Sequence, residues 1–317
     1  MKFTFGSDPE FALTYKGHFT SAIGVLPEKK KAITTDRNGF YFDNVLAEVA
    51  VRPEDNKVGA VEAVRSALDT LTRIVAPAKV TIQAAMNFPV AELKHAKAIE
   101  AGCVAEYSAY SLDRIVPPEE FVVQNPDTDY MQHITAFRTV GGHVHLGAEK
   151  GALQDGMLQP YVVKMMDLFV GIPEVFFNKD KTAKERRQVY GVAGSHRRPD
   201  YGIEYRPLSN FWFSSPRYVE LVYDLCAFTL DFVNRKGHLK FWTIYDDLLD
   251  EDDPSIAHHC YGYDLKAMRL AMNNYDKKGA EKYMTLIASE LPNGLFKELE
   301  DAINYEPGTL EDEWLLR

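Results

Sequence analysis

Apolar and polar residues alternate in several short runs along the first two thirds of the chain, and such runs predict β-strands with one buried and one polar face. The clearest run is TVGGHVHLG at residues 139–147, where Val144 and Leu146 share one face and His143 and His145 share the other. Shorter runs lie at residues 2–5, 40–53, 80–86 and 203–206. This pattern predicts a sheet with a hydrophobic core behind it and polar side chains in front.

Apolar residues spaced three or four apart predict helices. A long stripe at residues 57–76 predicts an early helix, and residues 158–177 are apolar enough for a buried helix with a kink near Gly171. Further helices are predicted at residues 91–101, 218–233, 264–274, 280–290 and 294–303. The basic, glycine-containing stretch at residues 184–198 is expected to be a charged loop, and the tail from Tyr305 is expected to be loosely held.

The composition changes this picture little. It is 46% hydrophobic and 26% charged, as in ordinary globular proteins, and the length of 317 residues permits two domains or one large one. The net charge of −10 argues against a generic nucleic-acid partner, although arginines that converge on one cleft can still bind an anion.

The cysteines and the first residues bear on location. Cys103, Cys226 and Cys260 are spaced as neither a disulfide framework nor a zinc site, which is typical of reduced thiols. The first residues, MKFTFGSDPEF, are too few and too polar for a signal peptide, and no run approaches the roughly 20 apolar residues of a membrane span. The sequence therefore predicts a cytoplasmic protein without a membrane partner.

Polar groups stand inside four of the strand-like runs. They are Asp8 with Glu10, Asp43 with Glu48, His143 with His145, and Glu204 with Arg206. In an apolar run Glu48 is costly unless it is bound to a cation or paired, for which Arg52 is the alternative partner. Asp8 and Glu10 flank Pro9, so they lie either on one strand face or in a turn. The two histidines fit either a site or a solvated strand face.

The chemistry of this set is that of a metal–nucleotide site. Carboxylates with an imidazole suit Mg²⁺ or Mn²⁺ better than zinc, and several carboxylates repel one another unless a cation lies between them. Arg197, Arg198 and Arg206 can bind phosphate or carboxylate through paired hydrogen bonds. Together these residue types point to phosphoryl transfer from a nucleotide.

Four motifs in this order resemble the glutamine synthetase / glutamate–cysteine ligase superfamily of carboxylate–amine ligases. They are GSDPEF, DNVLAEVAVRP, GGHVHLG and the IEYRPLSN run that ends at Asn210. Within the superfamily the chain resembles the phage-associated amidoligases, the COOH-NH2 ligase type 2 (phiEco32-like) family. The resemblance implies an α+β fold, in which helices pack on the outer face of a curved, mainly antiparallel sheet. It also implies one catalytic domain over residues 1–317, with the active-site strands in residues 1–214 and a helical part in residues 215–317.

The resemblance also implies roles for individual residues. One metal would be held by Asp8, His143 and Glu204, and a second by Glu10, Asp43 and Glu48. Asn44 or Asp36 are alternatives to Asp43 in the second site. Arg206 would lie beside the transferred phosphoryl group, with Arg197 and Arg198 as further catalytic residues. ATP would be bound by His145, Arg197 and Arg206.

The reaction implied by the resemblance is amide formation at the expense of ATP, with Mg²⁺ or Mn²⁺. ATP would phosphorylate a carboxylate, and an amine would displace phosphate from the acyl phosphate. The partners would be a small-molecule or peptide carboxylate and an amine, and the oligomeric state is unknown. Three alternatives stay open: a guanidine-kinase-like phosphotransferase, a metal-dependent hydrolase, and a non-catalytic structural or interaction protein on the same fold.

Overall fold

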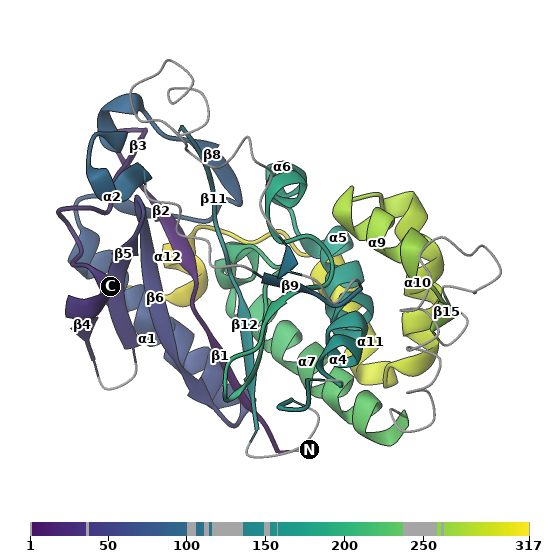
Figure 1. Cartoon of the computed structure of the whole chain (residues 1–317). Coiled ribbons are helices and arrows are strands. Elements are labelled where there is room, and N and C mark those ends of the chain that lie inside the picture. The colour runs from purple at the N-terminus through teal and green to yellow at the C-terminus, as the bar shows by residue number, and fades with distance from the viewer. Residues whose placement is uncertain are drawn as a thin grey trace.

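The computed structural model describes residues 2–35, 38–99, 106–110, 114–115, 136–148, 153–156, 158–236, 259–260 and 263–316. Within these residues a 12-stranded antiparallel sheet runs through the molecule, and helices cover it (Figure 1). The fold is therefore α+β, in agreement with the alternating runs and the helical stripes.

The strands of the main sheet are distributed between residues 4 and 205. They are β1 Thr4–Ser7, β2 Glu10–Tyr15, β3 His18–Thr20, β4 Ile33–Thr34, β5 Asn38–Asp43, β6 Leu46–Glu54, β7 Lys79–Thr81, β9 Glu106–Ser108, β10 Arg114–Ile115, β12 Val144–Gly147, β13 Ser195–Arg197 and β14 Gly202–Tyr205. They lie in the order β10-β9-β13-β14-β12-β1-β6-β2-β3, with β5 also paired to β6, β4 to β5, and β7 to β2. Two small pairs stand apart: β8 Ala85–Asn87 with β11 Phe137–Thr139, and β15 His259–Cys260 with β16 Tyr263–Asp264.

Most of the predicted helices are confirmed to within a few residues. The helices are α1 Lys57–Val75, α2 Ala96–Ile99, α4 Gln159–Met166, α5 Ile172–Phe177, α6 Ala183–Val189, α7 Pro216–Lys236, α9 Leu265–Asn273, α10 Lys277–Glu290, α11 Asn293–Ile303 and α12 Leu310–Trp314. Short 3₁₀ segments are η1 Lys29–Lys31, η2 Val90–Leu93 and η5 Asn210–Ser214. A π-helical segment, η4 Asp167–Gly171, joins α4 to α5 and accounts for the irregularity predicted near Gly171.

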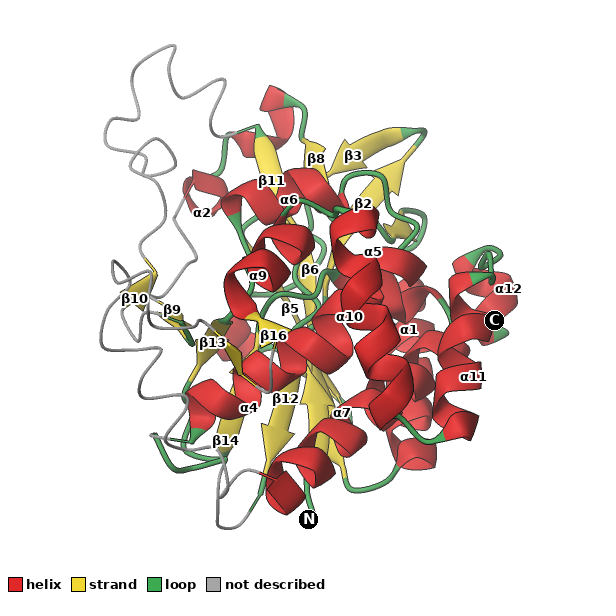
Figure 2. Ribbon diagram, turned by 90° about the vertical axis from the view of Figure 1, so that its right-hand side faces the viewer, coloured by secondary structure: helices red, strands yellow, loops and turns green. Residues whose placement is uncertain are grey.

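The apolar face of the central strands packs against helices. Phe5 of β1 makes ring contacts with Trp212 and with Tyr223 of α7, at centroid distances of 5.9 and 5.3 Å. Val144 and Leu146 of β12 are fully buried in the same core, as predicted. Figure 2 shows α1, α7 and α10 on one side of the sheet. Because side chains alternate along a strand, the polar residues of these strands lie on the other face.

The prediction of a charged loop at residues 184–198 is wrong. Helix α6 and strand β13 occupy much of this stretch, and Arg186 and Arg187 are buried. Arg187 Nη2 donates to Glu174 Oε2 at 2.6 Å, and Arg186 Nη1 donates to the carbonyl oxygen of Pro207 at 2.6 Å. A buried guanidinium needs such partners, and they come from segments that the local pattern does not include.

Three smaller predictions are also corrected. The tail from Tyr305 is held by α12, because Trp314 is 1% exposed and donates from Nε1 to the carbonyl oxygen of Phe213 at 2.8 Å. The described part of residues 91–101 contains two short turns, η2 and α2, in place of one helix. Residues 80–86 are divided between β7 and β8.

In the part of the chain that the structure describes, none of the helices has both the length and the apolar character needed to cross a bilayer.

Candidate functional site

The register of four central strands aligns polar positions in one row. Arg197 of β13 lies opposite Glu204 of β14. Glu204 in turn lies opposite His145 of β12, and His145 lies opposite Gly6 of β1. Residues directly opposite each other in an antiparallel pair share a sheet face, so the row faces away from the helical core.

Strand β1 ends at Ser7 and β2 begins at Glu10, so the regular strand is interrupted at Asp8 and Pro9. Pro9 has no N–H to donate, and its carbonyl accepts from Val49 N at 3.0 Å. Ser7 lies opposite Val51 and Glu10 lies opposite Glu48, so the segment keeps one register along β6 through Pro9. This corresponds to the strand alternative for GSDPEF and not to the turn, although Asp8 and Glu10 join different groups.

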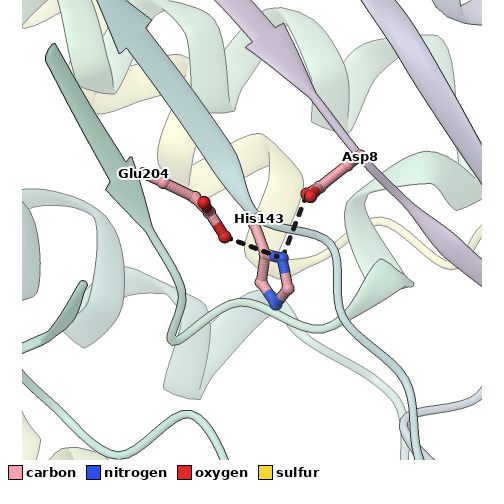
Figure 3. Close-up of side chains that lie close together, drawn as sticks. All are labelled: Asp8, His143 and Glu204. Carbon is pink, nitrogen blue, oxygen red and sulfur yellow. Dashed lines mark hydrogen bonds and ion pairs between the residues drawn. The ribbon is translucent and has the colours of Figure 1, made fainter. Parts of the chain in front are cut away.

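Asp8, His143 and Glu204 form a compact group, the histidine cluster (Figure 3). Asp8 Oδ1 lies 3.0 Å from His143 Nδ1, and Glu204 Oε1 lies 3.6 Å from the same nitrogen. One potential ligand atom from each residue lies within 4.8 Å of the others. Ser7 Oγ donates to the carbonyl oxygen of His143 at 2.6 Å, which ties β1 to the entry of β12. The structure therefore brings together the three residues assigned by resemblance to one metal.

Cationic and imidazole groups surround the histidine cluster. His145 Nε2 lies 3.0 Å from Asp8 Oδ1. Arg197 Nη1 donates to Glu204 Oε1 at 3.3 Å, and Arg206 Nη1 contacts the same oxygen. Glu204 and Arg206 thus form an ion pair as well as lining the cluster.

The pKa values in this cluster follow from burial and from these neighbours. Burial raises the pKa of Asp8, but the imidazoles of His143 and His145 outweigh it and hold this pKa well below its usual range. Burial, with Arg206 nearby, lowers the pKa of His143 to about 4, so its ring is neutral at pH 7. Burial lowers the pKa of His145, but Asp8 raises it more, and the net shift is upward. The cluster is therefore charge-compensated, and it presents the neutral imidazole that metals bind.

Two tyrosines that the sequence patterns did not single out contact the histidines. Tyr190 Oη lies 3.5 Å from His143 Nε2. Tyr201 Oη lies 2.8 Å from His145 Nδ1, and the two rings stack at a centroid distance of 5.8 Å. A hydrogen bond at the second ring nitrogen orients an imidazole toward whatever it binds through the first. Neither tyrosine stands in an alternating run with the histidines, so no local signal marked them.

Side chains of η5, the segment that follows β14, hydrogen-bond to the backbone at or next to the strands that carry the site. Asn210 Nδ2 donates to the carbonyl oxygen of Glu10 at 3.0 Å, and Trp212 Nε1 donates to that of Gly142 at 2.9 Å. A Cβ at Gly142 would lie 2.4 Å from the carbonyl oxygen of Ser209. Only glycine therefore permits this close backbone crossing.

Glu10, Asp43 and Glu48 form a second group, the carboxylate cluster, with one oxygen of each within 4.8 Å of the others. Glu10 lies opposite Glu48 in the β2–β6 pair, and Tyr41 lies opposite Glu48 in the β5–β6 hairpin. The strand predicted at residues 40–53 is this hairpin, so Asp43 ends one strand while Glu48 belongs to the next.

The structure places Asp43 in this cluster and shows what one of its two alternatives, Asn44, contacts. Asn44 has a positive φ of 54°, and its Oδ1 accepts from Arg138 Nε at 2.7 Å, so its carbonyl is engaged outside the cluster. Asp36 lies outside the described residues. Glu48 accepts from Tyr41 Oη at 2.6 Å and from Lys29 Nζ at 3.5 Å. The alternative Glu48–Arg52 ion pair is thus replaced by other partners.

Burial and repulsion between like charges shift the pKa values of the carboxylate cluster. Burial, together with repulsion from its neighbours, raises the pKa of Glu10 to about 8 and that of Glu48 to about 7. Burial also raises the pKa of Asp43, against the opposing effects of Lys29 and Arg197. An all-oxygen set with excess negative charge fits Mg²⁺ or Mn²⁺, and the mixed donors of the histidine cluster also fit a divalent ion.

The metal-free protein should lose stability as pH rises from about 5 to 8. Because burial and repulsion place the pKa of Glu10 and of Glu48 above their unfolded values, the native state binds more protons in this window. Melting temperatures in chelator should fall by a few degrees across it, and saturating Mg²⁺ should flatten the profile. A melting temperature that rises with pH in chelator would contradict this account of the carboxylate cluster.

Arg198, which was predicted as a catalytic residue, lies apart from both clusters. The guanidinium of Arg198 stacks 4.4 Å from the centroid of Tyr107, and its Nε lies 3.4 Å from His196 Nε2. The structure therefore brings Arg197, but not Arg198, to the carboxylates.

Cys226 is fully buried and burial raises its pKa, which is the opposite of what a nucleophile needs. Cys103 lies outside the described residues.

The antiparallel sheet carries two acidic clusters, and each has donor atoms close enough together to hold a metal ion. The family model for phage phiEco32-like COOH.NH2 ligase-type 2 matches residues 83–243, half of the chain, and the chain belongs to this family. The match confirms the resemblance to this family, and the family name describes ligases that join a carboxylate to an amine. The matched region includes His143, Glu204 and Arg206. It begins after the other four carboxylates of the two clusters, Asp8, Glu10, Asp43 and Glu48. No curated protein matches the chain.

Proposed function

We propose that this protein is an ATP-dependent carboxylate–amine ligase that works through an acyl phosphate, on a fold like that of glutamine synthetase and glutamate–cysteine ligase. The observation that carries the proposal is the pair of clusters on one sheet face, with Arg197 and Arg206 beside them. The ionised Asp8 raises the pKa of Glu10 and of Glu48, so the two clusters are close enough to interact electrostatically. Family membership supports the ligase class, and the clusters support the metal and nucleotide chemistry.

The two clusters would each hold one divalent cation. Asp8, His143 and Glu204 would hold the first, and the three residues of the carboxylate cluster would hold the second. Bound Mg²⁺ or Mn²⁺ would offset the phosphate charges of ATP and the charge that develops during transfer.

The chain's own cations would bind the transferred group. A substrate carboxylate oxygen attacks the γ-phosphorus of ATP, an O–P bond forms, and ADP leaves. Arg206 is suited to the phosphoryl oxygens because its guanidinium is buried beside Glu204 and its backbone is held by Arg186. Arg186 Nη2 donates to the carbonyl oxygen of Arg206 at 3.2 Å, which fixes the start of this turn. Arg197 and His145, whose side chain is 22% exposed, would bind the remaining phosphate charge.

The second step forms the amide. An uncharged amine attacks the acyl carbon, the C–N bond forms, the C–O bond to phosphate breaks, and the nitrogen loses a proton. The leaving phosphate carries the oxygen that came from the carboxylate. The substrates would be a small-molecule or peptide carboxylate and an amine.

The decisive experiment uses hydroxylamine as a general amine with MgATP and a panel of ¹⁸O-labelled carboxylates. A ligase yields one hydroxamate, one ADP and one phosphate per turnover, and the ¹⁸O label appears in the phosphate. A phosphoguanidine formed from a guanidine panel, with no hydroxamate, would favour the kinase alternative. Cleavage of amides without ATP would favour a hydrolase, and the absence of nucleotide binding would favour the non-catalytic alternative.

Arg206→Lys should lower kcat by roughly 100-fold with little change in the KM for ATP. Lysine keeps the charge but loses the planar fork that can contact two phosphoryl oxygens as transfer proceeds. Arg52→Lys, at an exposed position of β6, is the matched control and should behave as wild type. A variant that changes KM alone, or that melts far below wild type with full activity in the folded fraction, would contradict the role of Arg206.

A further inference from the structure

Lys29 reaches the carboxylate cluster from solvent. It begins η1, whose position is fixed to β5 by a hydrogen bond from Phe42 N to the carbonyl oxygen of Pro27 at 2.9 Å. Its Nζ lies 3.5 Å from Glu48 Oε1 and 4.9 Å from the ring centroid of Tyr41. The Lys29 side chain is 71% exposed, whereas that of Glu48 is 7% exposed. The backbone is thus anchored while the long side chain can leave without disturbing the core.

The negative charge of the carboxylate cluster makes Lys29 more than an exposed surface residue, because its ammonium offsets part of that charge. The histidine cluster has imidazoles and two guanidinium groups next to its carboxylates. The carboxylate cluster gathers three acidic side chains, and Tyr41 supplies only a neutral donor to Glu48. Lys29 lowers the pKa of Glu48 and of Asp43 against the effect of burial, so its ammonium supports their ionised forms.

We propose that Lys29 is a displaceable counter-ion of the carboxylate cluster. Its ammonium partly neutralises the cluster while no divalent cation is bound, and it withdraws when one binds. The same Glu48 oxygen cannot serve both cations well, because an ammonium within a few ångströms of a divalent ion is repelled. The inference rests on the proposed function only in taking this cluster as a cation site. It adds a residue that competes with the metal and sets the affinity of one site but not of the other.

Lys29→Met should therefore have two linked effects. Methionine keeps an apolar stem beside Tyr41 but removes the charge. The metal-free protein should melt about 1–3 °C lower, and the difference should vanish when Mn²⁺ saturates the protein. By the same linkage, one class of Mn²⁺ site should bind about 2–5-fold more tightly, which is the scale expected for a partly exposed ion pair. The other class should keep its affinity and act as an internal reference.

The measurements are Mn²⁺ titrations followed by the electron paramagnetic resonance signal of free Mn²⁺, and thermal melts with chelator and with saturating Mn²⁺. Lys30→Met is the matched control on the same exposed turn, and Lys29→Arg keeps the charge; both should bind Mn²⁺ as wild type does. Unchanged or weaker Mn²⁺ binding in Lys29→Met would overturn the proposal while leaving the ligase assignment intact. A melting difference that persists with saturating Mn²⁺ would also overturn it. Absence of Mn²⁺ binding in the wild type would overturn the cation sites and this inference together.

Discussion

Replacing Glu10 with glutamine is expected to raise the melting temperature of the metal-free protein and to abolish amide formation. At pH 8 repulsion between the ionised carboxylates of the cluster destabilises the native wild-type protein. Burial and this repulsion raise the pKa of Glu10 to about 8. Glutamine removes one charge, and its carbonyl oxygen can still accept from Gly141 N, which donates to Glu10 Oε2 at 2.6 Å. The gain should be a few degrees in chelator, since about 1 kcal/mol moves the midpoint by roughly 2 °C in a chain somewhat longer than 250 residues.

The loss of activity should be at least about 100-fold, with one fewer Mn²⁺ bound per chain, because a cation ligand has been replaced by a neutral amide. Glu28→Gln, an exposed carboxylate beside Lys29, is the control and should change neither the melting temperature nor the turnover. If Glu10→Gln melted lower than wild type in chelator, the carboxylate cluster would not be the source of repulsion described above.

Replacing Asp8 with asparagine should have the opposite effect on stability. The imidazoles of His143 and His145 overcome burial and hold the pKa of Asp8 well below its usual range, so its ionised form stabilises the native state. This stabilisation is fully present above the unfolded pKa and disappears only as pH falls through the lower native value. At pH 7.5 in chelator we expect Asp8→Asn to melt several degrees below wild type, with ligase activity reduced at least about 100-fold.

The matched control for this variant is Asp200→Asn, at an exposed position next to Tyr201. Melts in chelator, Mn²⁺ stoichiometry and hydroxamate formation are the three measurements. Asp8→Asn that melted above wild type would show that the histidine cluster is not charge-compensated. The pair of variants thus separates stability from chemistry: both should lose activity, while their melting temperatures should move in opposite directions.

The chain pattern predicted the parts of the site that depend on strand periodicity. His143 and His145 share a face because side chains alternate, and both rings lie 3.0 Å from Asp8 Oδ1. The resemblance to the ligase superfamily also implied that Asp8, His143 and Glu204 form one group and Glu10, Asp43 and Glu48 another, and the structure brings each group together. Their roles as metal ligands stay a prediction that the two variants above address.

Predictions about segments with tertiary partners were the ones that needed correction. Residues 184–198 look like a solvated basic loop, yet Arg187 is buried on Glu174 and Arg186 on the carbonyl oxygens that follow β14. The tail looked loose because its anchors are distant in sequence. Trp314 donates to a carbonyl group 101 positions earlier in the chain, and the carbonyl oxygen of Tyr305 accepts from Tyr218 Oη, 87 positions earlier. Such partners are distant in sequence, so no local periodicity reports them.

The sequence thus settled the alternation of the strands, the helical stripes and the kinds of donor atoms available, because each follows from residue type and spacing along a few turns or strand positions. How charge is balanced was settled by the packing. The histidine cluster is compensated because β13, β14 and the turn after it bring Arg197 and Arg206 to Glu204. The carboxylate cluster has Lys29 beside Glu48 at its solvent side because η1 is pinned to β5. Electrostatic energy depends on distance in space, and only the folded chain specifies those distances.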